Sequence, residues 1–194
     1  MRIRFDGKTV VVSGAGHGFG RCIAETFAQL GARVFGCDLS GAELAETAKA
    51  GVDTEVLDLT DRAAAAAWIA QIEQTTGGAV DVLVNNAGGV AEQEMDPIEE
   101  VPDADWDRVF AVNIGAAFAL SRAVAAGMKR AGSGRIVNIS SGAGLGPSLT
   151  GIQAYCSAKH AVVGLTRTTG ARARAIRDHR QQRGAGLRPL QCGV

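Results

Sequence analysis

Residues 8–20 of the chain read KTVVVSGAGHGFG, and this stretch decides the fold. Its first six residues are a continuous run rich in β-branched side chains, which is typical of a strand covered on both faces. A glycine-rich turn follows, and a helix is predicted from about Gly18 to Leu30, ended by Gly31. Glycines at this junction allow a tight turn. They also let a pyrophosphate approach the free N–H groups at the start of the helix, where the helix dipole favours an anion.

The rest of the chain repeats this alternation of a short apolar run with a longer helical stretch, which favours βα units and a mostly parallel sheet. The candidate strands are Lys8–Ser13, Arg33–Cys37, Thr54–Leu57, Val80–Val84 and Arg135–Ile139. An alanine-rich helix is predicted over Asp61–Thr76. Either Asp103 or Asp105 is placed to cap a long helix that runs to about Arg130. One domain is therefore predicted over residues 1–170.

The composition is that of a single soluble globular domain, because 46% of the 194 residues are hydrophobic and 21% are charged. No stretch long enough to cross a membrane lacks charge or strong polarity, and Arg2, Arg4 and Asp6 do not suit a signal peptide. We therefore expect a cytoplasmic protein with no membrane partner. The cysteines form no CxxC pair and have no histidine at metal-ligand spacing, so neither disulfides nor a metal site is expected. They are Cys22, Cys37, Cys156 and Cys192.

Asp38 lies at the end of the second predicted strand, at the distance beyond the glycine turn that dinucleotide sites require. A carboxylate at the tip of this strand can accept both hydroxyls of an adenosine ribose, and it repels a 2′-phosphate. Together with the glycine turn, it predicts a dinucleotide site that prefers NAD to NADP. His17 is less decisive, since a basic residue at this position suits NADP whereas a neutral histidine can simply cap the turn. A purely structural glycine turn is the alternative.

Five ordered motifs resemble the short-chain dehydrogenase/reductase family over residues 5–169. They are Ser13-Gly14-x-x-x-Gly18-x-Gly20, Asn85-Asn86-Ala87-Gly88 after the fourth strand, Asn113, Ser140-Ser141 after the fifth strand, and Tyr155-Cys156-Ser157-Ala158-Lys159. The resemblance implies a Rossmann-type doubly wound parallel sheet between two helical layers, with strand order 3-2-1-4-5 and the cofactor at the carboxyl ends of the strands. The sixth and seventh strands of the family are not recognisable in this sequence.

Tyr155 and Lys159 are four residues apart on a predicted helix, so their side chains share one face. A free phenol ionises near pH 10 and is a poor acid or base at neutral pH. A neighbouring ammonium group stabilises the phenolate and makes such a tyrosine usable near pH 7. Singly, each of these residues has an ordinary structural explanation. Their joint occurrence in the order of the family favours the functional one.

The resemblance implies a role for each of four catalytic residues. Tyr155 exchanges a proton with the substrate oxygen, and Lys159 holds the nicotinamide ribose. Ser141 hydrogen-bonds the substrate oxygen, and Asn113 holds a relay water to Lys159. The spacing from Ser141 to Tyr155 is one residue longer than is usual in the family, which leaves Ser140 as an alternative.

The resemblance also implies the cofactor contacts. Asp58 is expected to meet the exocyclic amine of the adenine beside Leu59, and the loop after the fourth strand lines the cleft. The full expected set is Gly14, His17, Gly18, Phe19, Gly20, Asp38, Asp58, Leu59, Asn86, Ala87, Gly88, Tyr155 and Lys159.

The implied activity is hydride transfer between NAD(H) and a secondary alcohol or ketone, like that of a 3-oxoacyl reductase or a small alcohol dehydrogenase. The alternative is a catalytically impaired remnant that still binds NAD. Family members usually associate through the helices that correspond here to residues 105–130 and 153–169, which implies a homodimer or homotetramer. The particular alcohol is not encoded in any motif.

The composition changes near Gly170. Residues 1–170 hold 14 Lys and Arg against 19 Asp and Glu, whereas residues 171–194 hold six Arg against one Asp. No strand-like run follows, so residues 171–194 are interpreted as a non-homologous tail. A basic tail that touches nucleic acid is the alternative, but nothing else in the chain is basic, and no nucleic-acid partner is expected.

A one-base shift of reading frame near codon 169 explains the tail better. With free choice of synonymous codons, residues Thr169 to Arg188 can be back-translated and reread in the shifted frame as LALELARSGITVNSVGPGYV. That reading continues an amphipathic helix, adds a β-branched strand and ends in the Asn-x-x-x-Pro-Gly turn of the family. We therefore expect a frameshift, and low activity or low solubility of the chain as given.

Overall fold

The computed structural model describes residues 3–91, 95–148 and 151–185, and from residue 171 onward it describes the backbone only. The strands are β1 (Thr9–Ser13), β2 (Arg33–Asp38), β3 (Asp53–Val56), β4 (Val82–Asn85) and β5 (Arg135–Asn138). The α-helices are α1 (Gly18–Gln29), α2 (Gly41–Ala48), α3 (Arg62–Thr76), α4 (Asp103–Phe110), α5 (Ala116–Ala131) and α6 (Gln153–Ala185). Short 3₁₀ turns, η1 (Ile98–Glu100) and η3 (Gly142–Gly144), and a π-helical turn, η2 (Ala111–Gly115), complete the set.

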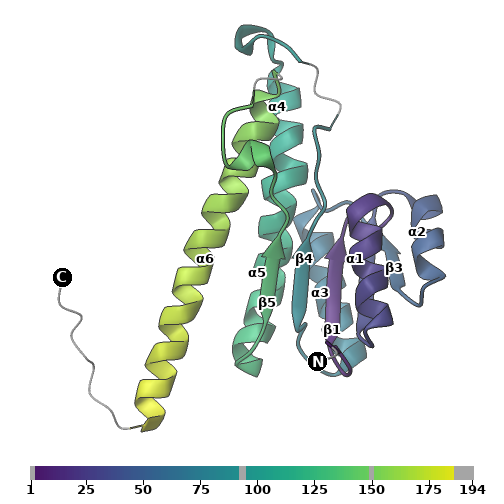
Figure 1. Cartoon of the computed structure of the whole chain (residues 1–194), viewed down its shortest axis with the longest axis vertical. Coiled ribbons are helices and arrows are strands. Elements are labelled where there is room, and N and C mark those ends of the chain that lie inside the picture. Colours follow the sequence, from purple (N-terminus) through teal and green to yellow (C-terminus); the bar gives the residue numbers. More distant parts are fainter. Residues whose placement is uncertain (1–2, 92–94, 149–150, 186–194) are drawn as a thin grey trace.

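The five strands form one parallel sheet in the order β3-β2-β1-β4-β5, as the sequence predicted (Figure 1). The chain starts at the centre of the sheet, moves outward through β2 and β3, and then crosses back to place β4 on the other side of β1. This reversal opens a crevice at the carboxyl ends of β1 and β4, where ligands bind in sheets of this kind.

The sheet packs on both faces because successive side chains of a strand point in opposite directions. In β1, Val11 belongs to a core cluster with residues of α3 and α5, whereas Val10 and Val12 belong to a second cluster with residues of α1 and α2. All three valines are fully buried. The continuous apolar run that began the sequence argument is therefore explained by burial on both faces.

The element boundaries differ from the sequence expectation by two residues at most in the strands, the largest difference being the start of β4 at Val82 rather than Val80. The expected cap of the long helix was wrong. Pro102 is the N-cap residue of α4 and makes no side-chain cap, while Asp103 and Asp105 lie inside the first turn. There a negative charge still interacts favourably with the helix dipole, which is why acidic residues are common at both kinds of position.

The single helix expected to run to Arg130 is divided by the π-helical turn η2. By length and composition alone, Asp103–Ala131 could cross a membrane. Its apolar residues Ala116, Leu120 and Val124 are instead buried in the cluster that covers the sheet. The hydropathy of this segment is therefore explained by the core.

Helix α6 continues to Ala185, past residue 169 where it was expected to end. Alanine and arginine are strong helix formers, which favours continuation of the helix through this part of the sequence. Figure 1 shows the C-terminal half of α6, in yellow, diverging from α5 and the sheet. Residues 186–194, including Cys192, lie outside the described part of the chain.

Candidate functional site

A cleft of about 730 Å³ lies along the carboxyl ends of the strands, within the size range of ligand pockets. Most of the residues predicted from the sequence line it, namely Gly14, His17, Gly18, Phe19, Asp38, Asp58, Leu59, Asn86, Ala87, Gly88, Ser141, Tyr155 and Lys159. Gly20 and Asn113 do not line it. They lie behind the glycine turn and behind Gly88, and they act on the cleft through these neighbours. Residues far apart in the sequence therefore meet in one place.

At Gly14 and Gly20 the glycine turn is packed so closely that a side chain does not fit. A Cβ atom at Gly14 would lie 2.9 Å from the Cα of Ala87, and the φ angle of Gly14 is +66°. A Cβ at Gly20 would collide with the carbonyl oxygen of Gly14. His17 is the N-cap residue of α1 but makes no side-chain hydrogen bond to the helix, so the suggested capping role is not seen. The exposed start of α1 thus offers its first N–H groups to an anion, as a pyrophosphate requires.

Ser13 and Asn86 fasten the turn to the loop after β4. The backbone N–H groups of Asn86 and Ala87 each donate to Ser13 Oγ at 3.1 Å. The side-chain amide of Asn86 donates to the carbonyl oxygens of Ser13 and Gly14, also at 3.1 Å. Asn86 therefore borders the cleft, but its amide hydrogens are used to hold the two loops together.

Asp38 is held by the backbone at the tip of β2. The N–H of Gly16 donates to Asp38 Oδ2 at 2.9 Å, and the N–H of Ser40 donates to Oδ1 at 3.3 Å. A carboxylate has about four acceptor positions, so both oxygens can still accept hydroxyl donors. This fixed, acceptor-only group beside a glycine turn fits an adenosine ribose.

The adenine end of the predicted site is formed after β3. Asp58 accepts hydrogen bonds from the N–H of Thr60 at 2.8 Å and from its hydroxyl at 2.7 Å, both on Oδ1. Its other oxygen has no such contact in the described residues and is free to accept an amine. Leu59 is 7% exposed and packs mainly into the core beneath the cleft.

Tyr155 and Lys159 lie together on α6, as their spacing predicted. The ammonium Nζ of Lys159 lies 5.6 Å from the centroid of the Tyr155 ring and donates to the carbonyl oxygen of Ile139 at 3.1 Å. Lys159 is only 4% exposed, and this burial lowers the pKa of its ammonium group from the ordinary value. Two of its three N–H donors remain for a ribose or a water.

The structure distinguishes the two serines after β5. Ser140 Oγ donates to the carbonyl oxygen of Lys159 at 3.1 Å, so its proton is committed to α6. Ser141 Oγ instead accepts from the N–H of Ala143 at 3.2 Å, which leaves its own proton available. Both line the cleft. Ser141 is thus the better placed to donate to a substrate oxygen.

Asn113 is 1% exposed and lies in the π-helical turn η2, a feature common near functional sites. Its side-chain amide donates to the carbonyl oxygens of Gly89 and Val109, both at 2.8 Å, and its Oδ1 accepts from the N–H of Gly89 at 3.2 Å. A Cβ at Gly88 would collide with this Oδ1 and would lie 3.4 Å from Lys159 Nζ. Asn113 therefore holds the loop that borders the lysine, and both of its amide hydrogens are already used.

Sequence reasoning missed Gly16 and Arg21, which shape the cofactor end of the cleft. Gly16 lies in the glycine turn at a position that the family motif leaves open, and Arg21 lies on α1 just behind it. The partners of Arg21 on α2, Glu43 and Thr47, are remote from it in the sequence. The extra glycine was the one available signal, and it did not reveal which contact required it.

The chain is similar in sequence and in fold to known dehydrogenases. The family model described as short chain dehydrogenase matches residues 8–177. The chain is 36% identical over 174 residues to a sorbitol dehydrogenase of Cereibacter sphaeroides, covering 87% of this chain and 65% of that protein. It is 38% identical to a D-β-hydroxybutyrate dehydrogenase of Rhizobium meliloti, covering 83% of this chain and 64% of that protein. The structure of an NAD⁺-bound xylitol dehydrogenase matches with a TM-score of 0.80 at 30% identity, covering 88% of this chain and 66% of that one. The chain thus spans about two thirds of the length of these relatives.

Proposed function

Because this chain belongs to the short-chain dehydrogenase family, we propose that it is an oxidoreductase that moves a hydride between NAD(H) and a secondary alcohol or its ketone. One observation carries the proposal. Tyr155, Lys159 and Ser141 lie in the same cleft as Asp38 and the glycine turn, so acid/base groups and a dinucleotide cradle share one volume.

The residues of the chain divide the proton chemistry between them. In the oxidation direction, the phenolate oxygen of Tyr155 takes the proton of the substrate hydroxyl. The Ser141 hydroxyl donates to the same substrate oxygen and holds it in place. The ammonium group of Lys159 stabilises the phenolate and has donors left for the nicotinamide ribose. A nicotinamide cofactor held beside Tyr155 and Lys159 would supply the acceptor for the hydride of the carbinol carbon. In the reduction direction Tyr155 returns the proton.

Asn113 acts on this chemistry through its neighbours. Its amide holds Gly89 and thereby the loop beside Lys159, so it keeps the space around the ammonium group in shape. A relay water at this point would have to donate to its Oδ1, since both amide hydrogens are taken.

The preference for NAD over NADP rests on Asp38. Its carboxylate lines the cleft at the tip of β2 and is fixed by two backbone N–H groups. A 2′-phosphate placed there would meet a negative charge, whereas two ribose hydroxyls would meet acceptors. The NAD⁺-bound relative is consistent with this preference.

For the substrate we propose a small molecule with a secondary hydroxyl group. The relatives named for sorbitol, β-hydroxybutyrate and xylitol dehydrogenate compounds that carry such a group. A 3-oxoacyl substrate is the related alternative. It is favoured by the similarity of the chain, at 34% identity, to a 3-oxoacyl-[acyl-carrier-protein] reductase of Thermotoga maritima.

Assembly and location complete the proposal. We propose a cytoplasmic homodimer or homotetramer that contacts neither membrane nor nucleic acid. Phe118 on α5 is 39% exposed, and the guanidinium groups of Arg62 and Arg122 lie over its ring, so this helix face offers an apolar centre with a charged rim. Sedimentation velocity of the purified protein measures the assembly.

The proposal is tested by binding and turnover together. Calorimetric titration with NAD and NADP measures the cofactor preference, and a panel of secondary alcohols and ketones measures activity. Tighter binding of NAD together with turnover of a panel member supports the proposal. Binding of NAD without turnover indicates the impaired remnant instead, and a chain that binds neither cofactor contradicts both.

A further inference from the structure

The N–H of Gly16 that orients Asp38 belongs to the Ala15–Gly16 peptide, and the next peptide of the turn, Gly16–His17, is held from behind. Arg21 reaches back from α1, and its Nε donates to the carbonyl oxygen of Gly16 at 2.9 Å, while its Nη2 contacts the same oxygen. Two nitrogen atoms of one guanidinium group therefore contact the same backbone carbonyl, that of Gly16. This matters because Gly16 is buried, and its N–H points at the carboxylate that is proposed to bind the ribose.

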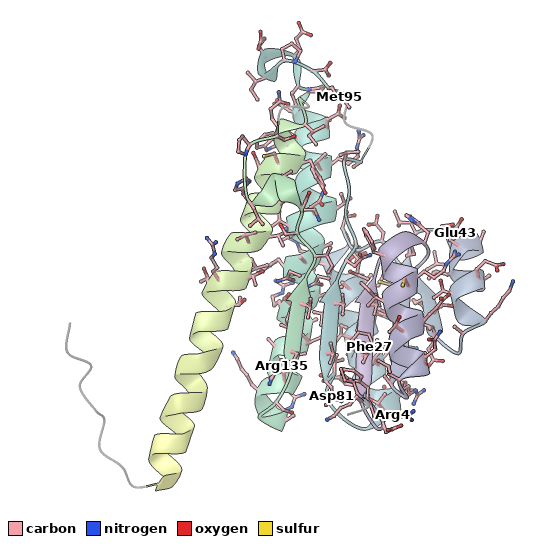
Figure 2. All side chains as sticks on the ribbon, viewed as in Figure 1. Arg4, Phe27, Glu43, Asp81, Met95 and Arg135 are labelled. Carbon is pink, nitrogen blue, oxygen red and sulfur yellow. The ribbon has the colours of Figure 1, made fainter. Side chains whose placement is uncertain are left out.

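The guanidinium group is anchored at its other side to α2. Arg21 Nη2 donates to the carbonyl oxygen of Glu43 at 3.1 Å and forms an ion pair with the Glu43 carboxylate. Arg21 Nε also donates to Thr47 Oγ1 at 3.2 Å. Figure 2 shows Glu43 at the end of α2 that faces the carboxyl ends of the strands.

Thr47 ties the same group to the turn a second time. It is fully buried, and its hydroxyl donates to the carbonyl oxygen of Ala15 at 2.8 Å. The two peptides that flank Gly16 are thus bound to one cluster of side chains from α1 and α2. Thr47 holds the Ala15–Gly16 peptide, which carries the Gly16 N–H, and Arg21 holds the Gly16–His17 peptide. We call Arg21, Glu43 and Thr47 the turn clamp.

The position of Gly16 has to be held closely, because there is no space for a side chain between its backbone and Asp38. A Cβ atom there would lie 2.8 Å from Asp38 Cγ, 2.9 Å from Asp38 Oδ2 and 3.1 Å from the Cβ of Glu43. The carboxylate consequently lies directly against the backbone of the turn. A small rotation of the Ala15–Gly16 peptide would withdraw the N–H that sets the direction of Oδ2.

We propose that Arg21 is a positioning residue for cofactor recognition, which fixes Asp38 for the adenosine ribose hydroxyls by holding both peptides that flank Gly16. Its guanidinium group binds the Gly16 carbonyl directly and reaches the Ala15 carbonyl through Thr47. This inference rests on the proposed NAD site and adds the determinant behind it. Arg21 is 28% exposed in its side chain and makes its contacts with the turn and α2, so it acts through Asp38 rather than on the cofactor.

The test isolates the ribose contact by comparing NAD with its 2′-deoxyadenosine analogue in calorimetric titrations. The two probes carry the same charge, so the loss of the positive charge of Arg21 affects both equally. Hydrogen bonds to a charged group predict about tenfold tighter binding of NAD by the parent. In Arg21→Met we expect this ratio to fall to about twofold or less. Arg21→Lys, which keeps the positive charge but lacks the planar fork of guanidinium donors, should lie between the two.

Three further variants serve as a second test and as controls. Gly16→Ala should reduce the same ratio by displacing Asp38, whereas Gly164→Ala, where nothing lies within 4 Å of the new Cβ, should not. Arg33→Met is the matched arginine control. It also removes an ion pair, with Asp53 at 3.3 Å, and a contact with the Phe35 ring, but it lies at the opposite end of β2.

The outcomes distinguish failure of the inference about Arg21 from failure of the proposed NAD site. A parent ratio that persists in folded Arg21→Met overturns the inference alone, as does a variant that weakens both probes by the same factor. A parent that binds NAD and the deoxy analogue equally contradicts the role of Asp38 in the proposed function, and the inference with it. Thermal unfolding of each variant confirms that the titrated protein is folded.

Discussion

Cys37 lies at the end of β2 directly below the cofactor end of the cleft, and it is fully buried. Burial raises the pKa of its thiol to about 12, from an ordinary value of 9.0, because the apolar surroundings disfavour a thiolate. The unfolded chain loses this proton near pH 9 while the folded chain retains it. The thiol therefore stabilises the fold fully below pH 9, and this contribution is lost as the pH rises toward 12.

Cys37→Ala tests this directly. The variant should be less stable at pH 7 by about 1 kcal/mol, because a buried atom is removed. Its free energy of unfolding should fall less steeply than that of the parent between pH 9 and 11, as measured by urea denaturation at several pH values. Parallel curves for the two proteins would show that the thiol does not titrate as described.

At this scale, the sequence predicted residue types better than their contacts. Tyr155 and Lys159 could be paired from their spacing on one helix, and Asp38 from its place after a strand. The division of labour between Ser140 and Ser141 could not, because it depends on a hydrogen bond to the backbone of α6, a separate element that begins only at Gln153. The contacts of Arg21 could not be predicted for the same reason, since its partners Glu43 and Thr47 come from another helix.

Among the elements, α3 and α4 give a matched test of helix capping. Asp61 caps α3 by accepting from the N–H groups of Ala63 and Ala64 at 2.9 and 3.0 Å. Asp103 looks similar in sequence but lies within the first turn of α4, after Pro102. Asp61→Ala should cost about 1 kcal/mol in the free energy of unfolding. Asp103→Ala should cost only a few tenths, roughly the effect of a charge near a helix start.

Urea denaturation of the two variants measures the difference, and cofactor titration serves as a control because neither residue lines the cleft. Equal losses of stability would contradict the assignment.

Most helices and strands were predictable because each carries its own periodic pattern and ending. The π-helical turn η2 and the position of the α4 cap were not, since both depend on how Asn113 and Pro102 meet the rest of the fold.

Strand β5 forms an edge of the described sheet, and Val137 on it is 45% exposed. An open edge with exposed apolar side chains favours association between chains. Val137→Thr should reduce light scattering by the concentrated protein while changing the free energy of unfolding by no more than about 0.5 kcal/mol. Val84, its register partner on β4, is 3% exposed and provides the control. Val84→Thr should destabilise the fold without reducing scattering, and the opposite pattern would contradict the account of this edge.

For the whole molecule, the sheet order and the position of the cleft followed from the alternation of elements and from the glycine turn. The course of the chain after Gly170 was not predicted, because α6 continues to Ala185, past residue 169 where the helix was expected to end. The reading-frame hypothesis for Thr169 to Arg188 stays a prediction. Sequencing the DNA of these codons decides it, and an unbroken frame without a nearby insertion or deletion would count against it.

The central claim is that one cleft holds NAD by its adenosine ribose and places a lysine-supported tyrosine at the reacting oxygen. The most direct measurement compares Tyr155→Phe with its parent, in whichever form turns over a secondary alcohol, the chain as given or the frame-corrected one. We expect the Kd for NAD to stay within about twofold, because removing the phenol hydroxyl leaves the Asp38 anchor intact. We expect kcat to fall by about a hundredfold or more, the usual contribution of a general acid or base. A phenylalanine variant that turns over its substrate as fast as the parent would contradict the claim.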